Sequence, residues 1–169
     1  MSELRPGIDY IGVGVGAIIV NDLGQVLLSQ RGPKARNRVG QWENPGGSLE
    51  FGEEFDEAIV REIREELGID VRVEGVLRVV NHIIAAERQH WVAPTFVVRH
   101  VGGTPRITEP DKCSAIGWFD LDDLPEPLAE ISAADLDYCR RVIDSGGVLQ
   151  PAEWCRVGGA ANELSDTIQ

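Results

Sequence analysis

The sequence predicts an α/β protein in which helices cover both faces of a mixed β-sheet. Two segments repeat apolar residues at helical spacing, five others are apolar or alternating runs bounded by turn residues, and the two kinds are interleaved. In chain order they read strand, strand, helix, strand, strand, strand, helix, which matches an α/β/α sandwich. A chain of 169 residues is long enough for a single domain with a substantial core.

Composition narrows the class of protein. The net charge is −12, from 28 acidic and 16 basic residues. This balance argues against a nucleic-acid polymer or a membrane surface as partner, because binders of either need a basic patch. An acidic protein that handles phosphates must recruit cations. Cys113, Cys139 and Cys155 are far apart and lack metal-ligand spacing, which predicts a reduced, cytoplasmic protein. The apolar run 11–20 is too short and too rich in glycine to span a bilayer.

The chain is expected to open with an irregular arm over residues 1–10 and then to form its first two strands. These strands are expected at Tyr10–Val20 and Gln25–Gln30, and the turn-rich tetrapeptide 21–24 joins them.

Gly12, Gly14 and Gly16 alternate along the first expected strand. They are not a dinucleotide fingerprint, because the third glycine comes one residue early and no helix pattern follows. Period-two glycines leave one strand face without side chains. Two interpretations stay open: close packing against another backbone, or room for a flat ligand such as a nucleobase.

Arg31, Lys34, Arg36 and Arg38 form the one dense basic cluster, in a segment that contains Gly32-Pro33 and is therefore expected to be a loop. A solvated loop is one interpretation. The other is that one or two of these residues reach substrate phosphates, since arginine matches phosphate oxygens with a planar donor fork. Arg31 is the first candidate because it stands at a strand end.

The segment that follows approaches the first helix through a tight turn. Pro45 and two glycines allow backbone carbonyls to point inward. Trp42 is expected to belong to the core, and Asn44 is a candidate substrate-binding residue.

The first helix carries the most informative pattern of the chain. At about 100° per residue, Phe55, Ile59, Ile63 and Leu67 form one apolar stripe, and Gly68 is a natural C-cap. The carboxylates at positions 62, 65 and 66 share a face at the edge of that stripe. Like charges at this spacing repel, and a hard divalent cation with oxygen ligands would compensate them. A solvated acidic face is the alternative.

Residues 47–69 resemble the signature of the Nudix hydrolase family, Gly-x5-Glu-x7-Arg-Glu-U-x-Glu-Glu-x-Gly-U, in which U is a bulky aliphatic residue. Every fixed position is filled, by Gly47, Glu53, Arg61, Glu62, Ile63, Glu65, Glu66, Gly68 and Ile69. The resemblance extends over residues 11–145, which we take as a Nudix domain followed by a tail at 146–169. It implies a Nudix-type α/β/α sandwich around a mixed β-sheet.

The resemblance also implies a reaction, in which water attacks a phosphorus atom of a diphosphate linkage. It implies Mg²⁺, replaceable by Mn²⁺, with these expected ligands: the Gly47 carbonyl, Glu62, Glu65, Glu66 and, from a loop before the last strand, Glu109, with Asp111 as second choice. A solvated loop acid is the alternative for that last position. Glu65 or Glu62 is expected to be the general base, since a base needs only to reach the water. Glu53 is expected to support the site through Arg61, which can also pair with the carboxylate at i+4.

After the signature, long strands are expected at Val71–Ile84, with a bend at Gly75, and at His90–Val101, then a short one at Ala115–Phe119. Residues 120–125 read as a helical turn ended by proline.

The second helix is expected at Ser132–Ser145, with Ser132 as N-cap and Asp135 at N3. The three histidines, at positions 82, 90 and 100, are each expected to be structural or exposed. Residues 148–169 are expected to pack loosely.

The substrate is less constrained, since a fold does not fix function. Members that cleave ADP-ribose often carry a proline shortly after the signature, and diadenosine-polyphosphate members a tyrosine; this chain has residues 84–87 there, Ile-Ala-Ala-Glu. The chain looks more similar to the MutT-like group, which implies (d)NTP plus water giving (d)NMP plus pyrophosphate. The alternatives are an ADP-ribose or nucleotide-sugar pyrophosphatase and a catalytically silent nucleotide-binding module. A homodimer is expected from the family alone.

Overall fold

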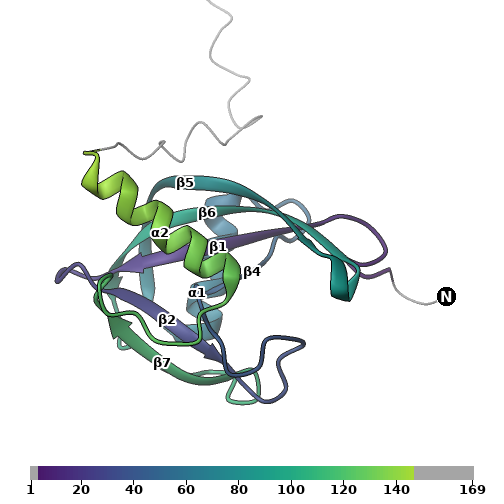
Figure 1. The fold of residues 1–169 in the computed structure, drawn as a ribbon, viewed down its shortest axis with the longest axis horizontal. Coiled ribbons are helices and arrows are strands. Elements are labelled where there is room, and N and C mark those ends of the chain that lie inside the picture. The colour runs from purple at the N-terminus through teal and green to yellow at the C-terminus, as the bar shows by residue number, and fades with distance from the viewer. Residues whose placement is uncertain (1–3, 147–169) are drawn as a thin grey trace, which may run out of the picture.

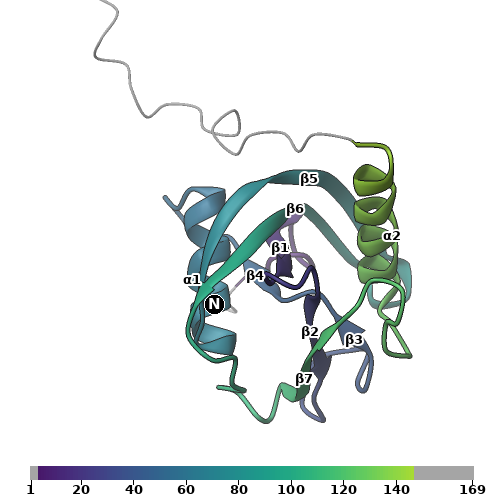
Figure 2. The same ribbon diagram turned by 90° about the vertical axis from the view of Figure 1, so that its left-hand side faces the viewer.

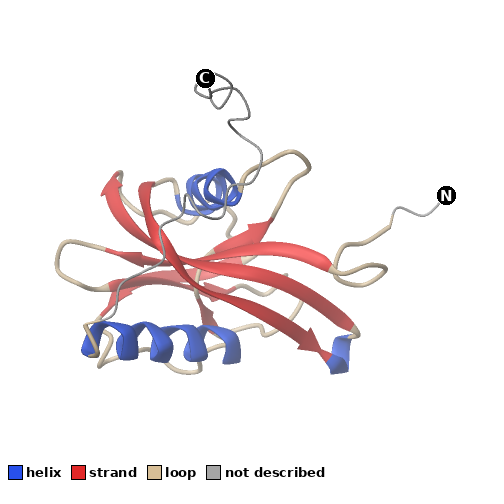
Figure 3. Cartoon of the chain, turned by 90° about the horizontal axis from the view of Figure 1, so that it is seen from above, coloured by secondary structure: helices blue, strands red, loops and turns tan. Residues whose placement is uncertain are grey.

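The computed structural model describes residues 4–146, and in it a curved mixed sheet lies between two helices. Helix α1 (Phe55–Leu67) covers one face of the sheet and α2 (Glu130–Asp144) covers the other (Figures 2 and 3). This arrangement confirms the predicted α/β/α sandwich. No helix within residues 4–146 is long and apolar enough to cross a membrane.

The sheet of the described part has seven strands. They are β1 (Gly12–Val20), β2 (Val26–Arg31), β3 (Trp42–Glu43), β4 (Gly46–Ser48), β5 (Asp70–Ile84), β6 (Gln89–Gly102) and β7 (Cys113–Phe119). The main order is β3-β2-β1-β6-β5, with β4 paired to β1 and β7 paired to β2. Only β1 and β6 run parallel, so the sheet is mixed. The two shortest strands, β3 and β4, were not predicted.

Each helix closes its own hydrophobic core. Ile59, Ile63 and Leu67 of α1 are buried against strand residues such as Phe96, while Phe55 is partly buried. On the opposite face, Leu136 of α2 packs over a second buried cluster that includes β1 and β2. Fully burying one such side chain is worth about 1.5–3 kcal/mol, which explains why the apolar stripe determines how α1 lies on the sheet. The predicted stripe is confirmed.

The ends of α1 follow its local sequence. The backbone N–H of Glu54, the N-cap, donates to Glu57 Oε2 over 3.3 Å. Gly68 adopts a left-handed conformation with φ of 65°, and its N–H donates to the Arg64 carbonyl. The C-cap prediction is therefore confirmed, because glycine takes this conformation without a Cβ clash.

Three local predictions were wrong or incomplete. Helix α2 begins at Glu130 with Ala129 as N-cap, so Ser132 is not the cap. Residues 120–125 form a turn closed by the Asp123 N–H on the Asp120 carbonyl, and no helical turn. The arm before β1 is tied down, because the Gly7 carbonyl accepts the N–H of His90. The expected tail at 148–169 lies outside the described residues.

The long hairpin of β5 and β6 carries the 3-10 turn η1 (Ala85–Glu87) at its tip, which extends beyond α2 (Figure 1). The pairing register shifts between Val73 and Gly75, which confirms the predicted bend.

Candidate active site

Arg61 lies at the centre of the acidic face of α1. Its guanidinium contacts Glu53 at 2.7 Å, Glu62 at 3.1 Å and Glu65 at 3.2 Å, and it donates to the Ser48 carbonyl. The predicted pairing of Arg61 with Glu53 and with the i+4 acid is therefore present. Hydrogen bonding to Arg61 is the main cause that lowers the pKa of Glu53, and Arg61 is held more firmly protonated in return. The Arg61 guanidinium thus links the loop before α1 to the helix.

The space around Gly47 explains why the signature begins with glycine. A Cβ built at this position would lie 2.1 Å from the carboxyl carbon of Glu62. At the neighbouring Gly46, a Cβ would lie 2.2 Å from the Val15 carbonyl oxygen. The two glycines therefore allow β4 to pack closely between β1 and the acidic face of α1. The Gly47 backbone is brought directly against one of the expected metal-ligating carboxylates.

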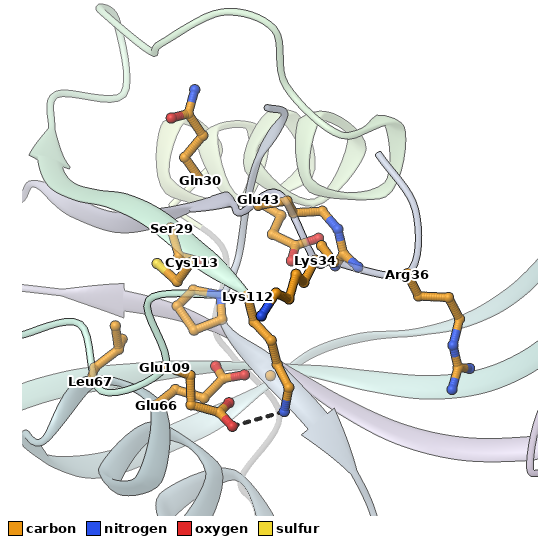
Figure 4. Close-up of a pocket in the computed structure, with 14 residues that line it drawn as sticks. Ser29, Gln30, Lys34, Arg36, Glu43, Glu66, Leu67, Glu109, Lys112 and Cys113 are labelled. Carbon is orange, nitrogen blue, oxygen red and sulfur yellow. Dashed lines mark hydrogen bonds and ion pairs between the residues drawn. The ribbon is translucent and has the colours of Figure 1, made fainter. Parts of the chain in front are cut away.

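Glu66 is the most perturbed acid of the site. Its pKa is raised to about 8, chiefly by burial and then by the nearby carboxylates of Glu62, Glu43 and Glu109. Figure 4 shows Glu109 beside Glu66, as expected for the loop acid. Asp111 instead turns outward to Lys34 at 2.7 Å, with two thirds of its side chain exposed. Lys112 Nζ pairs with Glu109 Oε1 at 2.8 Å and so compensates part of the negative charge that gathers around Glu66 (Figure 4).

These donors fit a hard divalent cation by their chemistry, since all are carboxylate or carbonyl oxygens. Within residues 4–146, no three acidic, histidine or cysteine side chains already converge on one point. Glu65 in particular is 61% exposed and turns to Arg61, whereas Glu62 is 15% exposed. An ion would therefore have to draw the oxygens together by side-chain rotation.

A cavity of about 420 Å³ opens beside Glu66, and we name it the first cavity. Acidic and basic side chains line it together (Figure 4). The acids are Glu43, Glu66 and Glu109, and the bases are Arg31, Lys34, Arg36 and Lys112. Two of the acids are ion-paired, Glu43 with Arg31 at 2.6 Å and Glu109 with Lys112 at 2.8 Å. A lining of mixed charge suits a ligand that carries several phosphates together with a metal ion.

Arg31 reaches this cavity from the end of β2, as expected. Its Nη1 lies 2.6 Å from Glu43 Oε1, and its Nε donates to the Asn37 carbonyl over 2.6 Å. Both side chains of the ion pair are 22% exposed. Burial raises the pKa of Glu43, and the Arg31 charge opposes that shift. Glu43 was not predicted as a site residue; its one signal is an acid next to the largely buried Trp42.

A second cavity, of about 430 Å³, lies over the glycine face of β1 and the adjoining part of β6. Arg31 and Glu43 line both cavities and so form the junction between them. The period-two glycines serve two purposes here. A Cβ on Gly12 would meet the Trp91 ring at 2.4 Å, whereas one on Gly16 would meet only the Thr95 hydroxyl at 3.7 Å. Gly12 is thus needed for close packing, and Gly16 leaves open space in the cavity.

Asp135 anchors one side of the second cavity. It is 3% exposed and accepts hydrogen bonds from Arg78 Nε at 2.6 Å, Thr95 Oγ1 at 2.9 Å and Asn44 Nδ2 at 3.4 Å. The Ser132 hydroxyl accepts the backbone N–H of Asn44. Asn44 therefore lines the cavity as predicted, but its amide nitrogen is engaged by Asp135. The sequence pattern suggested for Asp135 only the N3 position of a capping box begun by Ser132.

The histidines differ from one another. His90 contacts Asn81, and His100 contacts the carbonyls of Gly102 and Gly103, which agrees with structural roles. His82 lines the second cavity and lies 3.1 Å from Arg38. The pKa of His82 is lowered, mainly by burial and next by the Arg38 charge, while more distant acids oppose the shift.

Comparisons with known proteins agree with this geometry. A family model described as NUDIX domain matches residues 11–138. The chain is 33% identical over 128 residues to an ADP-ribose pyrophosphatase of Methanocaldococcus jannaschii, covering 76% of this chain and 73% of that relative. It is also 33% identical over 127 residues to an 8-oxo-dGDP phosphatase of Danio rerio, covering 74% of this chain but 36% of the relative.

A crystal structure of a MutT NUDIX hydrolase from Burkholderia pseudomallei superposes with a TM-score of 0.69 at 45% identity. It covers 75% of this chain and 96% of that one.

Proposed function

Because the chain belongs to the Nudix hydrolase family, whose members act on nucleoside diphosphate-linked compounds, we propose that it hydrolyses a (d)NTP to (d)NMP and pyrophosphate. The observation that carries the proposal is the first cavity. There the acids of α1 and of the Glu109 loop lie in one cavity with Arg31 and three further basic residues. This cavity adjoins an open space of nucleoside size on the glycine face of β1.

Mg²⁺ is the proposed cofactor, with Mn²⁺ as a substitute. The residues that would hold it are Gly47 through its carbonyl, Glu62, Glu65, Glu66 and Glu109. When bound, such an ion neutralises charge on phosphate oxygens and lowers the pKa of a bound water. The raised pKa of Glu66 supports the assignment, since burial first and the neighbouring carboxylates second disfavour its charge, and a cation would relieve both.

Side chains of the site would carry out proton transfer, positioning and substrate binding. Glu65 or Glu62 would accept a proton from the attacking water. Both carboxylates contact Arg61, which Glu53 holds in turn, so Arg61 and Glu53 act as positioning residues for the general base. Arg31 would bind a phosphate oxygen at the junction of the two cavities. Asn44 would face the nucleoside through the part of its side chain that lines the second cavity.

A second candidate is ADP-ribose or a nucleotide sugar. The archaeal ADP-ribose pyrophosphatase favours it, because its identity of 33% extends over most of both chains. The second cavity also opens widely beside Gly14 and Gly16, with room for more than a base. A silent binding module is a weaker candidate, since it would not need the complete carboxylate set.

One experiment separates these candidates. The protein is incubated with Mg²⁺ and, separately, with dNTPs, oxidised dNTPs, ADP-ribose and diadenosine polyphosphates, and the products are separated by ion-exchange chromatography. Pyrophosphate from triphosphates alone supports the main proposal. AMP with ribose 5-phosphate supports the second candidate, and binding without turnover supports the silent module. Fractionation and light scattering test the proposed cytoplasmic location and homodimer.

A further inference from the structure

The loop that carries the basic cluster, residues 32–41, touches the tip of the β5–β6 hairpin. Asn37 Nδ2 donates to Glu87 Oε2 over 2.7 Å, and Arg38 Nη2 lies 3.1 Å from His82 Nε2. We call these two contacts the clasp. They join segments 50 and 44 residues apart. Because Asn37 and His82 also line the second cavity, the clasp lies at its edge.

The hairpin side of the clasp is fixed by the buried Gln89 and the half-buried Trp91. Gln89 Nε2 donates to the same Glu87 oxygen over 2.8 Å, and Gln89 Oε1 accepts from Trp91 Nε1 over 2.9 Å. Gln89 is 6% exposed, and the Trp91 ring packs against Gly7 and Gly12. Glu87 thus presents its carboxylate from a held position, although it lies at a hairpin tip.

The loop side of the clasp leads directly to the first cavity. The Asn37 carbonyl accepts the Arg31 Nε hydrogen bond, and the same guanidinium pairs with Glu43. Asn37 therefore holds Arg31 with its backbone while Glu87 holds Asn37 by its side chain. A continuous series of hydrogen bonds runs from Trp91 through these residues to the junction of the two cavities.

The backbone supports the same interpretation. Arg38, with φ of 51°, and Arg88, with φ of 53°, are the two non-glycine residues of the described part that have positive φ. One lies on each side of the clasp. Such conformations are unfavourable for residues with a Cβ, and they persist where surrounding contacts over-determine them. The clasp supplies such contacts.

We propose that Asn37 and Glu87 are positioning residues, which hold Arg31 where it binds a substrate phosphate. The proposal rests on the proposed function. Without the clasp the loop is free to shift, the Asn37 carbonyl leaves Arg31 Nε, and the guanidinium loses its fixed direction. A phosphate contact made equally in ground and transition state contributes to KM and leaves kcat unchanged, so its loss raises KM alone.

The test compares Glu87→Ala with Glu87→Gln in the full-length protein. Glu87→Ala is expected to raise KM for the preferred dNTP roughly three- to tenfold, the range of one net hydrogen bond, with kcat within about twofold. Glu87→Gln keeps an oxygen that accepts from Asn37 and Gln89, so its KM is expected to stay near that of the wild type. Asp137→Ala, which removes an exposed ion-paired acid of α2, is the matched control.

Epistasis with Arg31 distinguishes positioning from general damage to the fold. In an Arg31→Ala background, Glu87→Ala is expected to change KM by less than about twofold, because the residue it positions is gone. An unchanged KM in Glu87→Ala, or an equal rise in both backgrounds, would overturn the proposal.

The Kd of an α,β-methylene dNTP, measured by calorimetry, separates this proposal from the proposed function. If wild type binds the analogue but hydrolyses no nucleotide, the hydrolase assignment fails, and the clasp is judged by the same shifts in Kd. If wild type does not bind the analogue, both proposals fail.

Discussion

Removing the Asp135 carboxylate is predicted to destabilise the protein strongly. Asp135→Ala would leave the Arg78 guanidinium, 29% exposed, without its counter-charge, and the Thr95 hydroxyl and Asn44 amide without their acceptor. Breaking a buried pair on one side costs about 3–5 kcal/mol. Because Arg78 keeps partial access to water, we expect a loss near the lower limit, about 3 kcal/mol. For a chain of this length that loss lowers Tm by on the order of 6–12 °C.

An exposed ion pair provides the reference. Arg64 and Asp70 pair at 2.8 Å, but their side chains are 62% and 58% exposed. Asp70→Ala is therefore expected to cost about 0–1 kcal/mol. The assay is urea unfolding followed by tryptophan fluorescence, with the m-value checked for constancy.

A third variant tests the cause of the loss. Adding Arg78→Met to Asp135→Ala is expected to recover part of the stability, because the unpaired buried charge is removed as well. If Asp135→Ala costs no more than Asp70→Ala, or if Arg78→Met adds a further independent loss, the reasoning about a buried network is refuted.

Four further predictions concern the glycine turn and the clasp. Gly47→Ala is expected to lower kcat by on the order of 10- to 100-fold with little change in Tm, because the new methyl group displaces only the flexible carboxylate of Glu62. Gly46→Ala meets backbone and is expected to lower Tm instead. Arg88→Gly is expected to raise the free energy of unfolding by about 1 kcal/mol, since it removes a left-handed non-glycine residue. In the folded state the pKa of His82 is lowered from 6.5, so the unfolded chain takes up this proton more readily. The contribution of His82 to stability is therefore present above about pH 6.5 and is lost as the pH falls through its folded-state pKa. Wild type should therefore lose stability between pH 7 and 5 more steeply than His82→Gln.

Each of these has a contradicting outcome. A fully active Gly47→Ala protein would separate the glycine from the placement of Glu62. A lower Tm in Arg88→Gly would mean that the arginine side chain contributes more than its backbone conformation costs. Parallel pH profiles for wild type and His82→Gln would show that His82 titrates alike in both states, contrary to the lowered pKa.

The parts of the fold that the sequence predicted are those determined locally. The stripe of α1, its glycine C-cap and the hairpin bend at Gly75 depend on periodicity and on residues a few positions apart. The acidic face of α1 was predicted for the same reason. The pairing of Arg61 with Glu53 could be expected from the family resemblance, and the structure shows it.

The parts that were missed depend on contacts between distant segments. Asp135 was expected only at N3 of the second helix, and its network was missed because its partners, Arg78 and Thr95, lie 57 and 40 residues away. Glu43 stands in a two-residue strand that is defined by its pairing with the distant β2 and by the bridge from Trp42 to Leu128. Asn37 and Glu87 lie in two polar segments whose sequences do not indicate that they meet.

The most direct test of the central claim is a product analysis of the preferred dNTP with Mg²⁺. We expect equal amounts of dNMP and pyrophosphate, no products when EDTA removes the metal, and a kcat at least about 100-fold lower in Glu66→Gln, in line with loss of a principal electrostatic group. A Glu66→Gln protein with activity near that of the wild type, or release of inorganic phosphate with dNDP, would contradict the assignment of the α1 carboxylates and of the bond that is cleaved.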